Sequence, residues 1–145
     1  MTTVRDMLRK KGSEIYSVTP DQTVYDALAS MSKHNTGAVL VMSGNTVEGI
    51  VSERDCVRKV DLAGKQANVT KVSEIMTKKV ISIDASQDLE ECMTIMINNN
   101  IRHLPVYEDT KLLGLISVRD VLKEVVDYQK SLIAQLEGYI SGDGR

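Results

Sequence analysis

The sequence predicts an α/β (α+β) fold of two similar halves, each with the order strand, helix, strand, strand, helix, and a long helix at the C-terminal end. Two observations predict it: the chain matches itself at a shift of 65 residues, and apolar residues in each copy alternate between extended and helical spacing. The match needs no gap from about residue 15 to 58. Identical pairs include Gly49 with Gly114, Ser52 with Ser117, and Asp55 with Asp120.

Each copy opens with a short extended piece and an amphipathic helix. The extended pieces are expected at 15–19 and 80–84, and the helices at 23–35 and 88–100. Thr23 and Asp26 resemble a capping box at the start of the first helix. A copy of about 60 residues has little core alone, so the two copies should pack face to face with pseudo-two-fold symmetry.

Two strands and a final helix complete each copy. Apolar runs predict strands at 38–42 and 47–52 in the first copy and at 103–107 and 112–117 in the second. The last helix is expected at 121–140, and its apolar stripe exceeds what one repeat needs. We therefore expect its last turns to pack on a second subunit or over the other repeat. The predicted divisions are 1–64 for the first repeat, 65–128 for the second, and 129–145 for a C-terminal helix extension and tail.

Composition and charge exclude several classes of protein. The chain has 145 residues and a net charge of −2, with 18 basic and 20 acidic residues, which argues against a nucleic-acid binder. No apolar run approaches the length of a membrane span, so a soluble, cytoplasmic protein is expected. Cys56 and Cys92 form no C-x-x-C motif, so we expect buried free thiols and no metal site. The basic run at 9–11 is taken as solvated.

The repeated phrase, Gly-x-x-Ser-x-Arg-Asp, occurs where a strand ends and a helix begins. In one interpretation its Ser and Asp form only a helix capping box. In the other, the free N–H groups, hydroxyl and Arg of this helix terminus bind an anion, and the Asp accepts hydrogen bonds from ribose hydroxyls. Gly49 and Gly114 favour the second interpretation, since a strand glycine suggests that something approaches the backbone closely.

The segments "GIVSERD" and "GLISVRD", within two copies of this unit, resemble the cystathionine β-synthase (CBS) domain, which occurs in tandem pairs. The resemblance covers roughly residues 1–126, and the whole chain is most similar to short stand-alone CBS-pair proteins. It implies two clefts between the repeats that bind adenine nucleotides.

The resemblance assigns site residues by position. Ribose would bind to Asp55 in one cleft and Asp120 in the other. Phosphate would bind to Ser52, Arg54, Arg102, His103, Ser117 and Arg119. The base pocket of the Asp55 cleft would use Ile50, Val80, Ile81 and Ser82, and that of the Asp120 cleft would use Leu115, Ile15, Tyr16 and Ser17.

The two clefts are not expected to be equal. Arg102 and His103 precede a strand in the second copy, where their counterparts in the first copy are Gly37 and Ala38. Phosphate affinity should therefore be concentrated in the second repeat, and His103 should titrate near neutrality. Simpler interpretations stay open: Arg102 and His103 as polar surface residues, and Tyr16 as an ordinary packed strand residue.

The sequence favours a regulatory protein over an enzyme, because it shows no nucleophile–base pair and no metal-binding pattern. We expect a homodimeric sensor of AMP, ADP, ATP or NAD(H) that acts in trans on a target protein. The alternative is a dimeric interaction scaffold with vestigial ligand clefts. The residues do not rank the nucleotides, because too many bases are candidates for the phosphate tail.

Overall fold

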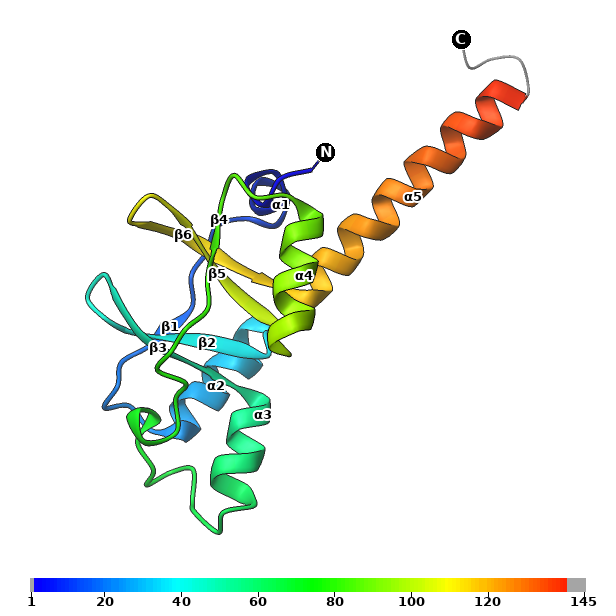
Figure 1. Cartoon of the computed structure of the whole chain (residues 1–145). Helices are drawn as coiled ribbons and strands as arrows, with labels where there is room; N and C mark the ends of the chain where they lie inside the picture. Colours follow the sequence, from blue (N-terminus) through cyan, green and yellow to red (C-terminus); the bar gives the residue numbers. More distant parts are fainter. Residues whose placement is uncertain (1, 141–145) are drawn as a thin grey trace. The chain divides into compact units, whose positions relative to one another are not determined.

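The computed structural model describes residues 2–140 and confirms the α/β fold with two repeats and a long C-terminal helix (Figure 1). The chain forms two compact units, which are described separately. The first-repeat unit contains residues 14–81, and the second-repeat unit contains the residues up to 13 together with those from 82 onward. Each unit holds a three-stranded mixed sheet.

The first-repeat unit has the sheet order β1-β2-β3. Strand β1 is parallel to β2, and β2 is antiparallel to β3 with an irregularity between Val41 and Met42. Its elements are β1 (Ser17–Val18), α2 (Val24–His34), β2 (Ala38–Ser43), β3 (Thr46–Ser52), α3 (Glu53–Cys56), the π-helix η1 (Val57–Asp61) and the 3₁₀-helix η2 (Val72–Glu74).

The second-repeat unit has the matching sheet order β4-β5-β6, with the irregularity at the equivalent step between Val106 and Tyr107. Its elements are α1 (Val4–Lys11), β4 (Ile83–Asp84), α4 (Leu89–Asn99), β5 (His103–Glu108), β6 (Lys111–Ser117) and α5 (Val118–Ile140). The registers of β2–β3 and β5–β6 correspond pair by pair at the 65-residue shift.

The long helices of the two sheets begin and end in the same way. Thr23 and Asp26 form the predicted capping box on α2, and Asp88 forms one with Glu91 on α4. Both helices end at an asparagine, Asn35 or Asn100, with φ 51°, a left-handed conformation that asparagine tolerates better than most residues. The repeat therefore extends to the backbone conformation of the helix ends.

The leading segment of each sequence copy packs with the other copy. Helix α1 precedes the first copy, yet Val4 N–H donates to the carbonyl of Gln87 at 2.8 Å, within the second-repeat unit. The equivalent segment before the second copy packs with the first, where Val72 N–H donates to the carbonyl of Gln22 at 2.8 Å. The compact units thus divide after residues 13 and 81, while the repeat boundaries predicted from the sequence stay predictions.

Small aliphatic side chains form the core of the first-repeat unit. Val24, Val39, Val41, Val51 and Val72 are fully buried and come from α2, both long strands and η2. Burial of such a side chain contributes roughly 1.5–3 kcal/mol to the stability of the fold, so aliphatic side chains can stabilise this core without Phe or Trp. Both cysteines are buried and free, as the sequence predicts, and burial raises the pKa of each thiol to about 11.

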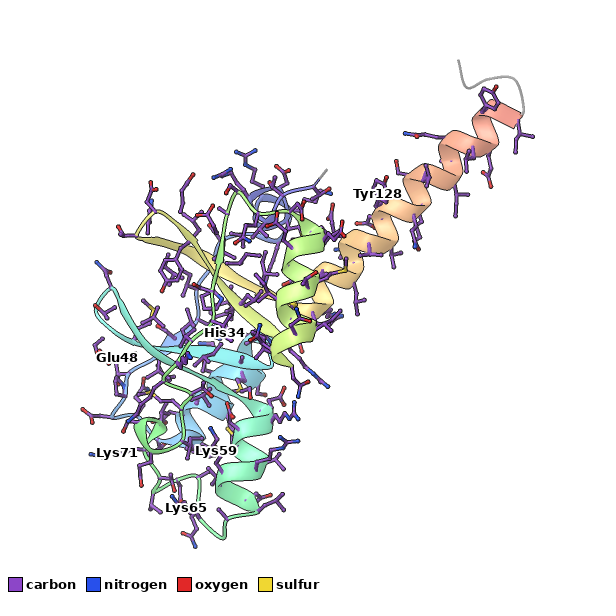
Figure 2. The ribbon with its side chains drawn as sticks, in the orientation of Figure 1. His34, Glu48, Lys59, Lys65, Lys71 and Tyr128 are labelled. Carbon is purple, nitrogen blue, oxygen red and sulfur yellow. The ribbon has the colours of Figure 1, made fainter. Side chains whose placement is uncertain are left out.

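Helix α5 begins at Val118, three residues before the predicted start, and its later turns extend beyond the sheet of its own unit (Figure 1). Large apolar side chains from its second half are exposed, and Tyr128 projects from it into open space (Figure 2). The tail at 141–145 lies outside the described residues. Among residues 2–140, no helix is long and apolar enough to cross a membrane.

Candidate functional site

The first copy of the repeated phrase forms a capped helix start. Ser52 ends β3, and its Oγ accepts from Asp55 N–H at 3.1 Å. In return, Asp55 Oδ2 accepts from Ser52 N–H and Oγ–H, both at 3.0 Å. Lys59, one turn further along the helical segment, places its Nζ 3.4 Å from Asp55 Oδ1 and donates to the carbonyl of Ile75 at 2.9 Å (Figure 2).

The second copy repeats this capping box with a different lysine. Asp120 Oδ2 accepts from Ser117 N–H at 2.8 Å and from Ser117 Oγ–H at 2.9 Å. The same oxygen accepts from Nζ of Lys11, on the last turn of α1, at 2.7 Å. Lys11 also donates to the carbonyl of Leu115 at 2.6 Å, so Leu115, which is predicted to line a base pocket, is joined to this cluster through its main chain.

Both aspartates therefore take part in capping boxes, as the first interpretation of the motif predicts, and this does not use all of their acceptor capacity. An ionised carboxylate has about four acceptor sites on its two oxygens. Asp120 Oδ1 accepts no hydrogen bond from residues 2–140, and its side chain is 23% exposed. The capping box fixes the carboxylate in one orientation and leaves Oδ1 available to a hydroxyl donor.

Asp120 is held in its ionised form. Burial opposes its ionisation, but hydrogen bonds from Lys11 and Ser117 outweigh burial, so the pKa of Asp120 lies below its ordinary value. At neutral pH the carboxylate is a hydrogen-bond acceptor only, which suits a sugar diol because each hydroxyl can donate to it.

His103 lies beside the second motif but does not titrate as the sequence analysis expected. It begins β5 and is paired in register with Ser117, while Val118 N–H donates to the carbonyl of Arg102 at 2.8 Å. Burial, and then the positive charge of Lys11, lower the pKa of His103 to about 4. The expectation of titration near neutrality is therefore wrong, and the imidazole is neutral at pH 7.

The difference between the two copies is present in the structure. Ala38 is paired with Ser52 as His103 is with Ser117, and Glu53 N–H donates to the carbonyl of Gly37 at 2.9 Å as Val118 N–H does to Arg102. The backbone is therefore conserved between copies, while the polar side chains occur in the second alone. Arg54, Arg102 and Arg119 are exposed.

The strand glycines are explained by the chain itself. A Cβ on Gly114 would lie 3.0 Å from Cδ2 of Leu8 on α1. A Cβ on Gly49 would lie 2.8 Å from both the sulfur of Met76 and the carbonyl oxygen of Thr77. The approaching groups are thus those of the exchanged segments, and the glycines no longer count as evidence for a ligand.

The base-pocket residues lie at the edges of the sheets. Ser17 is in β1, Ile50 is in β3, and Ser82 directly precedes β4. The ring of Tyr16 stacks on His34 with centroids 3.7 Å apart, and Tyr16 O–H donates to Glu14 at 2.5 Å. One face of the Tyr16 ring is therefore already covered by His34. The assignment of Ile15, Tyr16, Ser17, Val80, Ile81 and Ser82 to two base pockets stays a prediction.

Sequence reasoning missed the two lysines that contact the aspartates. Lys59 is four residues after Asp55, a spacing that places two side chains on the same helix face, so this pair was detectable. Lys11 is 109 residues from Asp120 in the sequence, and no local pattern links the two. Among residues 2–140, no group of three or more His, Cys, Asp or Glu side chains is placed to hold a metal ion.

Comparisons with known proteins agree with this architecture. The chain is 36% identical to the CBS domain-containing protein CBSX3, mitochondrial, of Arabidopsis thaliana, over 97% of its own length and 73% of that protein. The structure is similar to that of a putative signal-transduction protein with CBS domains from Burkholderia ambifaria MC40-6, with 44% identity, a TM-score of 0.84, and coverage of 87% and 95%. The cytoplasmic location stays a prediction.

One further likeness concerns the fold alone. The CBS domain pair of protein MJ0100, solved in complex with 5′-methylthioadenosine and S-adenosyl-L-methionine, has 22% identity and a TM-score of 0.76, with coverage of 88% and 98%. The pattern of the CBS domain family itself matches residues 3–62 and 72–127. These two matches include both repeats of the phrase, and the chain belongs to the CBS domain family, with a tandem pair of its domains.

Proposed function

We propose that this protein is a regulatory module that senses an adenine nucleotide (AMP, ADP, ATP or NAD(H)) and acts in trans on a partner protein. The observation that carries the proposal is the cluster at the start of α5. There, the ionised Asp120, with Oδ1 available, lies beside a capped helix start and near the cations Lys11 and Arg102. A carboxylate next to cationic groups suits a ligand with both hydroxyl donors and an anionic tail.

The roles follow from the chemistry of each group. Asp120 accepts from the ribose hydroxyls, as Asp55 does at the first-repeat site. Arg102, Arg119 and the neutral His103 donate to phosphate, and Arg54 does so at the first-repeat site. Ser52 and Ser117 would contact phosphate only if their hydroxyl protons left the aspartates to which they donate. The adenosyl ligands in the solved CBS pair of MJ0100 support this proposal, since that pair has the same fold.

Regulation requires that the nucleotide bind one arrangement of the protein more tightly than another. Helix α5 begins at the Asp120 motif and continues into the exposed apolar stripe, so it links the proposed site to a surface suited to a second protein chain. The similar Burkholderia protein is a putative signal-transduction protein with CBS domains, which supports a regulatory role.

Thermal unfolding with nucleotides tests the sensor proposal. A ligand at one hundred times its Kd adds about 2.7 kcal/mol to the free energy of unfolding, which raises Tm measurably. We expect AMP, ADP, ATP or NAD to give this shift. Asp120→Asn should weaken the tighter site at least tenfold, and Asp55→Asn should weaken the other, because an amide replaces one anionic acceptor.

The matched control for these variants is Glu53→Gln, which removes an acid from the same first turn of α3 but not from the capping box. It should leave nucleotide binding unchanged. If no nucleotide raises the Tm of the wild-type protein, the sensor proposal is wrong and the dimeric scaffold with vestigial clefts is favoured. Calorimetry at the same concentrations would report the stoichiometry.

The homodimer rests on the stripe along α5. Apolar residues recur every seven positions, a spacing typical of helices that pair with one another. One series is Val125, Leu132 and Tyr139, and the other is Val126, Ile133 and Ile140. Leu122 and Leu136 extend the same stripe. The exposed fractions of Leu132, Leu136 and Ile140 are 44%, 54% and 84%. We infer that a second copy of this chain covers the stripe.

Charge on the stripe should separate the subunits. Leu132→Glu combined with Leu136→Glu should convert the dimer to a monomer in sedimentation at micromolar concentration, because burial of two carboxylates opposes association. Ala134→Glu places one such charge on the opposite face of the helix and should leave the dimer intact. A wild-type protein that sediments as a monomer at high concentration would contradict the homodimer.

A further inference from the structure

Lys11 and Asp120 form a contact that a ribose diol bridging both carboxylate oxygens would rearrange. Three donors converge on the single oxygen Asp120 Oδ2, namely Lys11 Nζ and the N–H and Oγ–H of Ser117, at 2.7, 2.8 and 2.9 Å. One carboxylate oxygen has two lone pairs, so Oδ2 has no capacity left for a further hydroxyl. A ribose diol that donates one hydroxyl to each carboxylate oxygen would require a place on Oδ2, and one of the three donors would then have to leave.

Lys11 is the donor that can leave at least cost. The Ser117 contacts belong to the capping box and are fixed by the end of β6 and the start of α5. The Lys11 side chain is 37% exposed and ends a flexible four-carbon stem. Its ammonium has three protons, of which Asp120 and the carbonyl of Leu115 use two, so it can turn toward a new acceptor while keeping one contact.

The groups around Lys11 indicate where the phosphate of a bound nucleotide would lie. Lys11 Nζ shares Asp120 Oδ2 with Ser117, and Ser117 is paired in register with His103, so Lys11 lies beside a residue proposed to bind phosphate. We propose that Lys11 is a specificity residue of the second-repeat site: it is bound to Asp120 in the structure and transfers to the phosphate of a bound nucleotide. This inference rests on the proposed function and names the residue that selects phosphorylated ligands.

The consequence is selection against the unphosphorylated nucleoside. Adenosine would displace Lys11 from Asp120 and offer it no new anion, so the lost ion pair weakens binding. AMP displaces the same lysine and supplies an anion that forms a charge-assisted hydrogen bond with it. Lys11 thereby favours a nucleotide in two ways: it weakens the binding of adenosine, and it contacts the phosphate of AMP.

Calorimetric titration with AMP and with adenosine tests this inference. The measurements are made in the Asp55→Asn background, so that the second-repeat site dominates. Lys11→Met should weaken AMP binding about tenfold and strengthen adenosine binding about threefold, since the freed Asp120 no longer has to lose an ion pair. Lys11→Arg keeps the charge. Its ratio of AMP to adenosine affinity should be at least the square root of the wild-type ratio.

Lys10 provides the matched control. It is the neighbouring residue on α1 and is paired with the buried Glu124 of α5 at 3.0 Å, away from Asp120. Lys10→Met should lower Tm but leave the ratio of AMP to adenosine affinity unchanged. If Lys11→Met changes both affinities in the same direction or neither, the role of Lys11 is overturned while the sensor remains. If AMP does not bind to the wild-type protein, the role of Lys11 is overturned, and the sensor is overturned as well only if ADP, ATP and NAD also fail to bind.

Discussion

Gly49→Ala should lower the free energy of unfolding by about 3 kcal/mol, while the equivalent Gly114→Ala should lower it by about 1 kcal/mol or less. The added Cβ at position 49 would lie 2.8 Å from the carbonyl oxygen of Thr77 and 2.8 Å from the sulfur of Met76. Thr77 cannot withdraw easily, because it exchanges two backbone hydrogen bonds with Ile50 at 2.9 and 3.0 Å. At position 114 the new atom would meet a terminal methyl of Leu8 at 3.0 Å, and this side chain can turn slightly.

Urea unfolding of the two variants, followed by circular dichroism, measures this difference. A Gly49→Ala, Met76→Ala double variant should recover little stability, since the clash with the Thr77 backbone persists. Equal losses for Gly49→Ala and Gly114→Ala would contradict the distinction between a backbone and a side-chain obstacle. Gly114→Ala is the matched control for Gly49→Ala, because the two glycines occupy the same register position in their sheets.

Acid should destabilise the protein well before its carboxylates are protonated, because of His103. The pKa of this half-buried imidazole is about 4 in the folded protein, below its ordinary 6.5. Above pH 6.5 the imidazole is neutral in both states and has no effect. Between pH 6.5 and 4 the unfolded chain binds a proton that the folded protein does not, so about 3 kcal/mol of unfolding free energy is lost over this range.

The measurement is urea unfolding at pH 7, 5 and 4. His103→Gln should keep most of its stability between pH 7 and 4, since glutamine does not titrate. His34→Gln, which removes the other histidine, should retain the acid-dependent loss of the wild-type protein. If His103→Gln and the wild type lose stability in parallel, the imidazole is not the cause. The depressed pKa of Asp120 contributes in the same direction, but below this range, because its stabilisation is lost only as pH falls through its folded pKa.

The repeat made most of the fold predictable, because each element was seen twice. Apolar periodicity gave α2 and α4 within one residue at each end, and the run at 112–117 matches β6 closely. The short strands β1 and β4 were overestimated, since only two residues of each form a bridge with the neighbouring strand. The exchange of α1 was not predictable, because its contacts with residues 85–89 join parts of the chain far apart in sequence.

The site was predictable where the motif is local. Ser52 with Asp55, and Ser117 with Asp120, take the strand-to-helix position that the spacing indicates. The glycines and His103 were misread for a common reason. What lies against a strand glycine, and how deeply an imidazole is buried, depend on α1 and on the segment around Met76, which come from distant sequence.

The placement of α1 affects how the chain can fold during synthesis. The helix made first carries three buried apolar residues, Val4, Met7 and Leu8, whose packing partners include Gly114 of β6. Those partners leave the ribosome only after most of the polypeptide has been translated. A nascent chain halted between the two copies would therefore hold the complete first sheet, but α1 would lack its packing partners and the core of the first-repeat unit would lack η2.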